Sequence, residues 1–438
     1  MKKISRNIKN KTWFKLDNAG TVFPGQNTRT WSNVIRASIN LKEDVDPDLL
    51  FEAVKKCLPR FPTMAVRLRN GFFWHYIEKN PEDPVVVPDA NNPCMRIKYN
   101  ENNRYMFKLL YYKSRITLEI FHALTDGYGA CVFLNTITAE YLRMKGYEIP
   151  VGGMVLDINE APKAEEIEDS YIKYASKTGK EKIPLFKTYH RIGEKMPKHT
   201  SIITTGYVPV DIIKAKAKEY GVTITEYLSA ILMYLHMQFQ KNENLSQKDV
   251  CMQIPVNGRN QFESQTLRNF SVNYNIRIDP TWGDYTFEEV LKHLALSLRL
   301  TNNKKHLAVM FAGNLAIERN PVMRFVPLFI KDFAVGLTFA FAAEKTTTSV
   351  FTNVGIVKVP DEMLEHIDSF ILMPSPGRLN GGRVGAASIG NTMAITFANM
   401  YTNTDIEREF FRFLVREKIP VKIESNKQDK GDNICPTV

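Results

Sequence analysis

The clearest change in the hydrophobic pattern of the chain lies between residues 115 and 144. From residue 116 to residue 121 apolar and polar side chains alternate, and this period of two predicts a half-buried β-strand. His122 keeps the apolar parity, so its side chain is expected to leave the strand on the buried side. Asp126 and Gly127 begin a glycine-rich turn, after which apolar residues return every four positions, as in a helix. The pattern therefore predicts a histidine at the junction of a strand and a helix.

The first part of the chain predicts further strands around this unit. Asp46 followed by Pro47 predicts the start of a helix that ends near residue 58, because Asp caps helices and Pro fits the first helical position. The pair Asn70-Gly71 predicts a hairpin turn between two short strands. The expected strands are residues 30–41, 64–69, 72–78, 95–99 and 105–111, and residues 80–93 are expected to form a loop.

The second half of the chain contains a similar mixture of helices and strands. Gly221 predicts a helix end, and the pairs Thr223 with Glu226 and Thr286 with Glu289 predict capped helix starts. The expected helices are residues 211–220, 223–239, 286–300 and 405–416; the expected strands are 250–256, 270–278 and 350–359, with a hairpin around Gly390-Asn391.

Between these halves the regular pattern stops. Residues 150–200 carry an acidic cluster followed by a lysine-rich run, and a chain of 438 residues is long enough for two domains. We expect a mixed α/β protein with an N-terminal domain at 1–170, a linker at 171–195 and a C-terminal domain at 196–438.

Composition narrows the class of protein. Hydrophobic residues make up 44% and charged residues 24%, as in soluble globular proteins. Five cysteines form no C-x-x-C pair, which predicts free thiols and a reducing cytoplasm. The basic N-terminus is not followed by an apolar segment, so no signal peptide is expected. The apolar stretch at 325–343 is interrupted by Lys331 and Asp332, whereas a membrane span needs about 20 apolar residues.

The net charge of +11 has two explanations. One is a solvated surface without a specific partner. The other is a polyanionic ligand, either nucleic acid or a phosphate-bearing cofactor such as coenzyme A. Because the sequence contains no nucleic-acid motif and no basic array interleaved with aromatic residues, nucleic acid is the weaker choice.

His122 is the candidate for chemistry. A lone histidine is most often structural, but an imidazole held by a glycine-rich turn can take a proton from a hydroxyl or an amine. Asp126 has two readings, a helix cap or an ion pair that locks the loop of His122. Gly127-x-Gly129 lacks the third glycine of a dinucleotide site, and neither a second histidine at ligand spacing nor a cysteine cluster supports a metal.

The motif FHALTDG resembles the H-x-x-x-D-G motif of the coenzyme A-dependent acyltransferase superfamily, which includes chloramphenicol acetyltransferase, alcohol acetyltransferases and the condensation domains of peptide synthetases. Further segments follow in the family's order. Residues 254–272, IPVNGRNQFESQTLRNFSV, resemble the P-V-x-x-R…L-R-N-F segment of bacterial alcohol acetyltransferase-like members. Residues 321–333 and the strand 351–360, FTNVGIVKVP, are similar to their S-N-x-G region, with Thr352 in place of serine.

The resemblance implies a role for each matching residue. His122 is similar to the general base that activates the acceptor, and Gly127 to the glycine that leaves room for substrate. Asp126 resembles an aspartate that pairs with an arginine, for which Arg259 is the candidate by position. Thr352 and Asn353 fall in the strand near the domain interface, where a channel wall or an oxyanion donor is expected. Phe121 stands where peptide-forming condensation domains carry a first histidine, which disfavours peptide synthesis.

The resemblance also implies a fold and an activity. Two chloramphenicol-acetyltransferase-like domains are expected to form a V with a channel between them, and one chain holding both halves suggests a monomer. The expected reaction moves an acyl group from acyl-CoA to a small alcohol or amine, without a metal. Two alternatives remain, a catalytically silent binding or scaffold relative and an acyltransferase whose donor arrives on an acyl-carrier protein.

Overall fold

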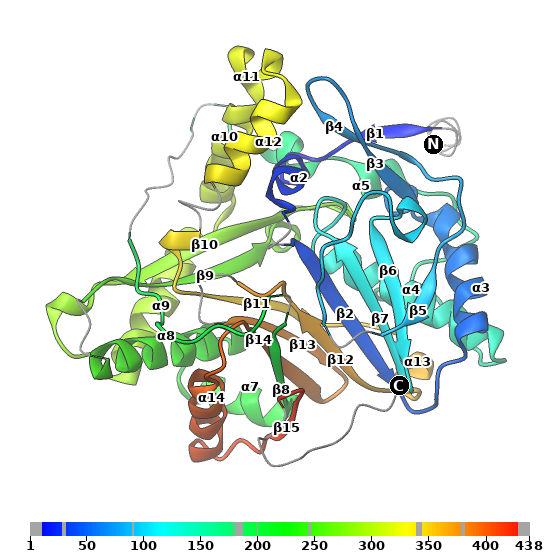
Figure 1. Cartoon of the computed structure of the whole chain (residues 1–438). Coiled ribbons are helices and arrows are strands. Elements are labelled where there is room, and N and C mark those ends of the chain that lie inside the picture. Colours follow the sequence, from blue (N-terminus) through cyan, green and yellow to red (C-terminus); the bar gives the residue numbers. More distant parts are fainter. Residues whose placement is uncertain are drawn as a thin grey trace.

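The computed structural model describes residues 11–28, 32–89, 92–177, 179, 187–198, 200–243, 247–338, 344–377 and 382–427. Cys435 and residues 178 and 180–186 of the predicted linker lie outside the described residues. The described chain is a mixed α/β fold with a sheet of five strands and a sheet of seven (Figure 1). The expectation of a mixed α/β fold is therefore confirmed, whereas the V with its channel stays a prediction.

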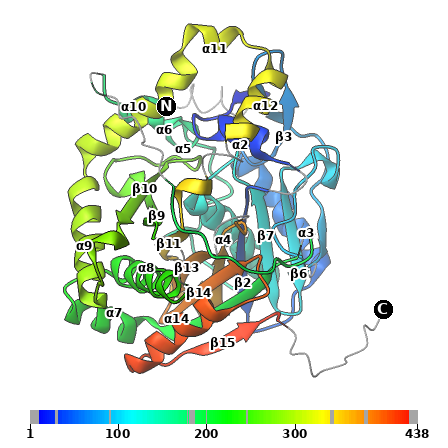
Figure 2. The same cartoon turned by 60° about the vertical axis from the view of Figure 1, so that its left-hand side comes forward.

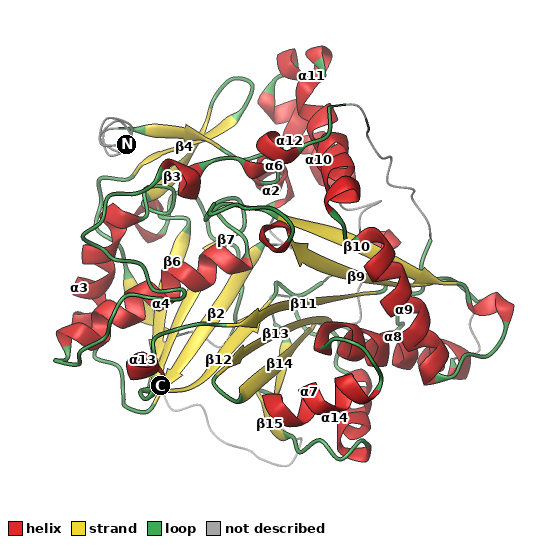
Figure 3. Cartoon of the chain, turned by 180° about the vertical axis from the view of Figure 1, so that it is seen from behind, coloured by secondary structure: helices red, strands yellow, loops and turns green. Residues whose placement is uncertain are grey.

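The five-stranded sheet has the order β12-β2-β7-β6-β5. Its members are β2 (Val34–Leu41), β5 (Val86–Pro88), β6 (Phe107–Tyr112), β7 (Arg115–Phe121) and β12 (Ile367–Met373). Helices α3 (Pro47–Cys57) and α4 (Gly127–Met144) lie side by side near this sheet, as Figure 3 shows from behind. The strand before His122 is thus central in the sheet. Its polar residues Thr117 and Glu119 are buried as well, so the expectation of a half-buried strand is wrong.

The seven-stranded sheet has the order β10-β9-β11-β13-β14-β8-β15. Its strands are β8 (Ile202–Pro209), β9 (Val250–Asn257), β10 (Ser271–Ile278), β11 (Ser349–Ile356), β13 (Arg383–Ile389), β14 (Thr392–Asn399) and β15 (Lys422–Ser425). Helices α7 (Val210–Glu219), α8 (Ile224–Asn242), α9 (Phe287–Thr301) and α14 (Asp405–Arg416) gather on one side of it (Figure 2). Their apolar faces and the sheet share one hydrophobic core.

Strand β12 links the two halves of the molecule. It comes from the C-terminal half of the chain but pairs antiparallel with β2 in the five-stranded sheet, with Phe370 opposite Ile39. The side chain of Asn40 also donates to the hydroxyl of Ser369 at 2.7 Å. The stretch predicted as the C-terminal domain therefore contributes an edge strand to the other sheet.

Several helix caps and turns that the sequence predicts are present in the structure. The carboxylate of Asp46 accepts hydrogen bonds from the backbone N–H groups of Asp48 and Leu49 and begins α3. The Thr223–Glu226 and Thr286–Glu289 pairs both form reciprocal capping boxes. Gly221 ends α7 with a φ of +69°, and Gly390-Asn391 turns β13 into β14 with Ile389 opposite Thr392.

Other expectations from the first part of the chain are wrong. Residues 95–99 form no strand, and the backbone N–H of Cys94 just before them donates to the Glu119 side chain at 2.6 Å instead of to a strand. The predicted loop 80–93 contains β5, which pairs parallel with β6. The predicted hairpin exists as β3 (Val66–Asn70) and β4 (His75–Lys79), but Asn70 pairs with His75, so the turn has four residues. Strand β1 (Trp13–Lys15) completes this small sheet.

The apolar stretch at 325–343 begins in a helical region made of α10 (Lys304–Arg319), α11 (Pro321–Phe325) and α12 (Leu328–Thr338). The two charges that interrupt it face the protein: Lys331 donates to the Phe73 carbonyl at 2.9 Å, and Asp332 lies 3.0 Å from the His75 ring. Within the described parts of the chain, no helix combines the length and the apolar character that a membrane crossing requires. The remaining short helices are α2 (Phe23–Gln26), α5 (Ala164–Ile167), α6 (Ser170–Tyr174) and α13 (Asp361–Leu364).

Candidate active site

His122 lies at the end of β7, in the wall of a cavity of about 1390 Å³. Its backbone N–H donates to the Asn33 carbonyl at 2.8 Å, which extends the pairing of β7 with β2 by one residue. The cavity is lined by residues of both sheets, including Val34 of β2 and Val256 of β9. The strand therefore delivers the imidazole to a space between the two halves of the chain.

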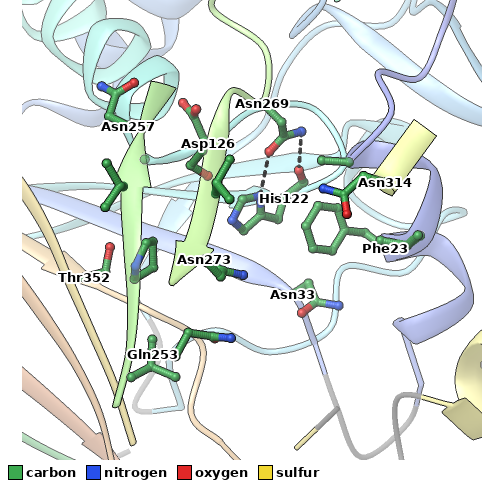
Figure 4. A pocket seen from close by; sticks show the side chains of 18 of the residues that line it. Phe23, Asn33, His122, Asp126, Gln253, Asn257, Asn269, Asn273, Asn314 and Thr352 are labelled. Atoms are coloured by element: carbon green, nitrogen blue, oxygen red, sulfur yellow. Dashed lines mark hydrogen bonds between the residues drawn. The ribbon is translucent and has the colours of Figure 1, made fainter. Parts of the chain in front are cut away.

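Asn269 fixes the orientation of the His122 ring. The Nδ1 atom of His122 lies 2.9 Å from Oδ1 of Asn269 (Figure 4). The Nδ2 group of Asn269 faces only acceptors, the His122 carbonyl at 3.0 Å and both Asp17 carboxylate oxygens at 3.2 Å. A reversed amide would set oxygen against oxygen at each of these contacts, so Oδ1 must face the ring. Nδ1 of His122 therefore carries the proton, and the lone pair is on Nε2.

The surroundings of His122 favour its neutral form. Burial lowers the pKa of His122 below the ordinary value of 6.5, because a charged imidazolium loses its hydration there. The Phe23 ring stacks on the imidazole with centroids 4.5 Å apart and planes 23° from parallel. A neutral ring with a free Nε2 near pH 7 is the protonation state that a general base needs.

Asp126 satisfies both roles that the sequence left open. Its Oδ1 accepts from the Gly129 backbone N–H at 3.2 Å and caps α4. Its Oδ2 accepts from Arg259 at 2.7 Å and from the Phe270 backbone N–H at 2.8 Å. One carboxylate thus joins the His122 loop to the start of α4 and to the segment at 266–270 from the other half of the chain.

Arg259 supports the same junction from the other side. Besides Asp126, its guanidinium donates to the carbonyls of Thr266 at 2.7 Å and Arg268 at 2.6 Å, and it lies 4.6 Å from the centroid of the Tyr128 ring. The Arg259–Asp126 ion pair that the resemblance implied is present, and both side chains are buried. Arg259 is not among the residues that line the cavity, and its guanidinium contacts the loop that carries Asp126.

The two glycines of the turn differ in how tightly they are enclosed. Gly127 lines the cavity, and a Cβ there would lie 3.0 Å from the Val354 side chain. A Cβ on Gly129 would lie 2.1 Å from the Thr125 hydroxyl oxygen and 2.2 Å from the Leu267 carbonyl oxygen. The close approach of the 267 backbone therefore requires glycine at 129, whereas a side chain on Gly127 would meet only the Val354 side chain.

Thr352 and Asn353 also lie in the cavity wall, on β11. Asn353 uses both ends of its amide within the protein: Nδ2 donates to the Thr225 hydroxyl at 3.1 Å, and Oδ1 accepts from the Gly355 N–H at 2.8 Å. Figure 4 shows Thr352 well apart from His122. The structure does not bring Thr352 next to the imidazole.

Sequence reasoning missed Asn269, Asp17 and Phe23. Asp17 is fully buried, accepts the Gly20 N–H at 2.6 Å and lies 3.4 Å from the Arg268 guanidinium. The signal for Asn269 was present, because it is the N of the L-R-N-F segment. No local pattern marked Asp17 or Phe23. Among the described residues, no group of three or more His, Cys, Asp or Glu side chains could hold a metal ion.

Residues 163–281 match the family model of the alcohol acetyltransferases. This segment contains Arg259 and Asn269 but not His122. The solved structures supply the comparison for the whole chain. Polyketide synthase associated protein 5 from Mycobacterium tuberculosis is similar with a TM-score of 0.58 at 14% identity, over 92% of this chain and 97% of that one. The chain has the fold of the coenzyme A-dependent acyltransferase superfamily.

Two further structures share this fold. Trichothecene 15-O-acetyltransferase from Fusarium sporotrichioides superposes with a TM-score of 0.56 at 11% identity, over 92% of this chain and 94% of that one. A mutant of the starter condensation domain of rhizomide synthetase, in complex with C8-CoA and Leu-SNAC, superposes with a TM-score of 0.57 at 11% identity, over 92% of this chain and 94% of that one. No curated protein sequence matches the chain. The family model thus matches part of the chain, and these structures show that their fold extends over most of it.

Proposed function

We propose that this protein transfers an acyl group from acyl-CoA to a hydroxyl or amine of a small acceptor, with His122 as the general base. The observation that supports this most strongly is the contact between Asn269 and Nδ1 of His122, which leaves Nε2 without a hydrogen bond to a described residue. An imidazole held in one tautomer by a buried amide is prepared to accept a proton from a bound ligand.

In the proposed reaction the acceptor hydroxyl donates to Nε2 of His122 while its oxygen attacks the thioester carbonyl carbon. Nε2 takes the proton as the new C–O bond forms, giving a tetrahedral intermediate and an imidazolium. Collapse of the intermediate breaks the C–S bond, and the departing thiolate takes the proton back from Nε2. The enzyme forms no covalent bond, which suits a cavity whose described wall contains no cysteine.

The oxyanion of the intermediate needs a hydrogen-bond donor. Neither Thr352 nor Asn353 is assigned this role, because Thr352 lies well apart from His122, whereas the donor has to reach the oxygen of the carbonyl that is attacked beside Nε2. The Asn353 amide is committed to Thr225 and Gly355. Asp126, Gly127 and Arg259 keep the role of loop support in this proposal.

Coenzyme A as the donor draws support from the rhizomide synthetase domain, which was solved with C8-CoA, and from the net charge of +11. A donor delivered on an acyl-carrier protein would use the same step at His122. Competition between free acetyl-CoA and an acetylated carrier protein distinguishes these two donors.

The test is release of free thiol from acetyl-CoA with a panel of alcohols and amines. His122→Ala should lower kcat about 10²- to 10⁴-fold on an accepted substrate, the usual range for a lost general base. His293→Ala, an exposed histidine outside the cavity wall, serves as the matched control and should retain wild-type activity. Equal rates for His122→Ala and the wild type would refute the role of His122 as the general base. Binding of coenzyme A without turnover on any acceptor would instead indicate a silent relative.

A further inference from the structure

Side-chain amides surround the open space in front of His122. Asn33 precedes β2, Gln253 lies on β9, Asn273 on β10 and Asn314 on α10, and all four line the cavity. Figure 4 shows Asn273 nearest the imidazole, Gln253 farther below it, and Asn33 and Asn314 to the right, beside Phe23. We call these four residues the amide ring. They come from four separate parts of the chain, so the shared amide side chain does not follow from a sequence repeat in one strand or helix.

Part of the amide ring is available to a ligand. Asn273 and Asn314 are exposed to the cavity, and their side chains make no hydrogen bond to another described residue. Gln253 uses Nε2 to donate to Asn275 at 3.2 Å, which leaves its Oε1 without a donor among the described residues. The cavity thus offers amide groups that can both donate and accept next to the candidate base.

The amide ring carries no formal charge, and the charged side chains that line the same cavity contact other groups of the protein, such as Lys331 with the Phe73 carbonyl at 2.9 Å and Glu318 with the Asn18 amide at 2.9 Å. Asp126 binds Arg259 at 2.7 Å, Glu226 binds Arg299 at 2.9 Å, and Asp332 lies 3.0 Å from His75. An ionic acceptor would have to displace these contacts to reach a counter-charge. A neutral ligand is the better match.

The amides also discriminate among neutral ligands. A hydroxyl both donates and accepts, so it can replace the water that solvates an amide, whereas a hydrocarbon chain displaces that water and leaves the amide unpaired. Each buried polar group left unpaired weakens binding about 5- to 150-fold. Sites built to bind a substrate hydroxyl reject analogues that lack it for the same reason.

We propose that the acceptor is a neutral polyhydroxylated molecule, such as a monosaccharide or a polyol. One of its hydroxyls lies against Nε2 of His122, while its neighbouring hydroxyls pair with Gln253, Asn273 and Asn314. This inference rests on the proposed function and adds the chemical class of the acceptor. The competing use of the amide ring is to bind the two amides of the pantetheine arm of coenzyme A.

The experiment compares sorbitol and glucose with 1-hexanol as acceptors for acetyl-CoA, in the wild type, Asn273→Leu and Asn314→Leu. We expect the wild type to prefer the polyols. Each variant should raise the KM for the polyol about 5-fold or more, narrow the preference over 1-hexanol and leave the KM for acetyl-CoA unchanged. Asn159→Leu is the matched control, because Asn159 is exposed, lies outside the cavity wall and makes no side-chain hydrogen bond to a described residue.

Two results would overturn the polyol proposal while the proposed acyl transfer stands. One is a wild type that prefers 1-hexanol. The other is a pair of variants that raise the KM for acetyl-CoA but not for the acceptor, which would assign the amides to pantetheine. If no acceptor supports turnover, the acyl transfer itself fails. Binding of sorbitol, measured by ligand-observed NMR, then tests the polyol site alone. If the wild type binds sorbitol and Asn273→Leu weakens that binding, the polyol site is supported. If the wild type does not bind sorbitol, the polyol site is refuted.

Discussion

Replacing Asn269 by leucine tests how the His122 tautomer is set. Leucine fills a similar volume but offers neither the acceptor for Nδ1–H nor the donor for the Asp17 carboxylate and the His122 carbonyl. The proton on the ring is then free to move to Nε2, which would point an N–H rather than a lone pair at the acceptor. The substitution therefore removes the base without removing the histidine.

The magnitude follows from the contacts that are lost. A buried donor left unpaired costs about 1–3 kcal/mol, and relief of that cost favours the wrong tautomer. Each 1.36 kcal/mol in the barrier changes the rate about tenfold, so we expect kcat to fall about 10- to 100-fold. The loss from His122→Ala sets the upper limit for the part of this effect that acts through the tautomer, because Asn269 also holds the Asp17 carboxylate.

The pH profile separates this role from a general loss of structure. The neutral base is lost as the pH falls through the pKa of His122, which burial holds below 6.5. The hydrogen bond that Nδ1–H of His122 donates to Asn269 partly opposes burial by stabilising the imidazolium. Asn269→Leu should therefore lower the pKa of His122 further and move the acid limb of kcat/KM to lower pH, as measured by thiol release at a series of pH values.

Thr266→Val is the matched control for Asn269→Leu. The Thr266 hydroxyl is buried in the same segment and donates to the Glu168 carbonyl at 2.7 Å, but it does not touch His122. The Thr266→Val protein should lose about as much thermal stability as Asn269→Leu but keep the kcat and the pH profile of the wild type. An Asn269→Leu protein with wild-type kcat and an unmoved acid limb would show that the amide does not set the tautomer.

Three further predictions concern the surroundings of the site. Arg259→Met leaves the buried Asp126 carboxylate without its cation and should lower the free energy of unfolding by about 3–5 kcal/mol in a denaturant titration. Arg277→Met breaks the more exposed pair with Asp249 and should cost about 1 kcal/mol or less; equal losses would contradict this reasoning. Gly129→Ala should destabilise by about 1–3 kcal/mol and reduce activity, because its Cβ meets the 267 backbone, whereas Gly152→Ala has room and should melt like the wild type. Burial raises the pKa of Cys57, Cys94 and Cys131, and that of Cys251 to about 12, so these thiols should react slowly in the folded protein. A Cys435→Ser protein should therefore show no rapid reaction with a thiol reagent until it is unfolded.

Features that depend on neighbours in sequence were the ones that could be predicted. The Asp46 cap, the Thr223 and Thr286 capping boxes and the turn at Gly390 each involve groups a few residues apart. Residues 95–99 have the composition of a strand, but the Cys94 N–H binds the distant Glu119 carboxylate, and no local pattern records such a partner. Strand β12 was missed altogether, and nothing in a single sequence would have joined it to β2.

The candidate site divides in the same way. His122 could be found because the strand, the histidine and the turn are contiguous. Its orientation depends on Asn269, which lies 147 positions away, and on Asp17 from near the start of the chain. Asp126 has both of the roles that the sequence suggested, because one carboxylate oxygen caps α4 and the other pairs with Arg259.

The pairing of β12 with β2 has a consequence for the synthesis of the protein. The backbone edge of β2 that β12 covers emerges from the ribosome about 330 residues before its partner. At about 5–20 residues per second, that edge waits about 20–60 seconds. An unpaired strand edge is a template for pairing with other chains. The nascent N-terminal half is therefore the stage at which this protein most needs a chaperone, and a chain that stops before residue 367 should aggregate rather than persist as a half-molecule.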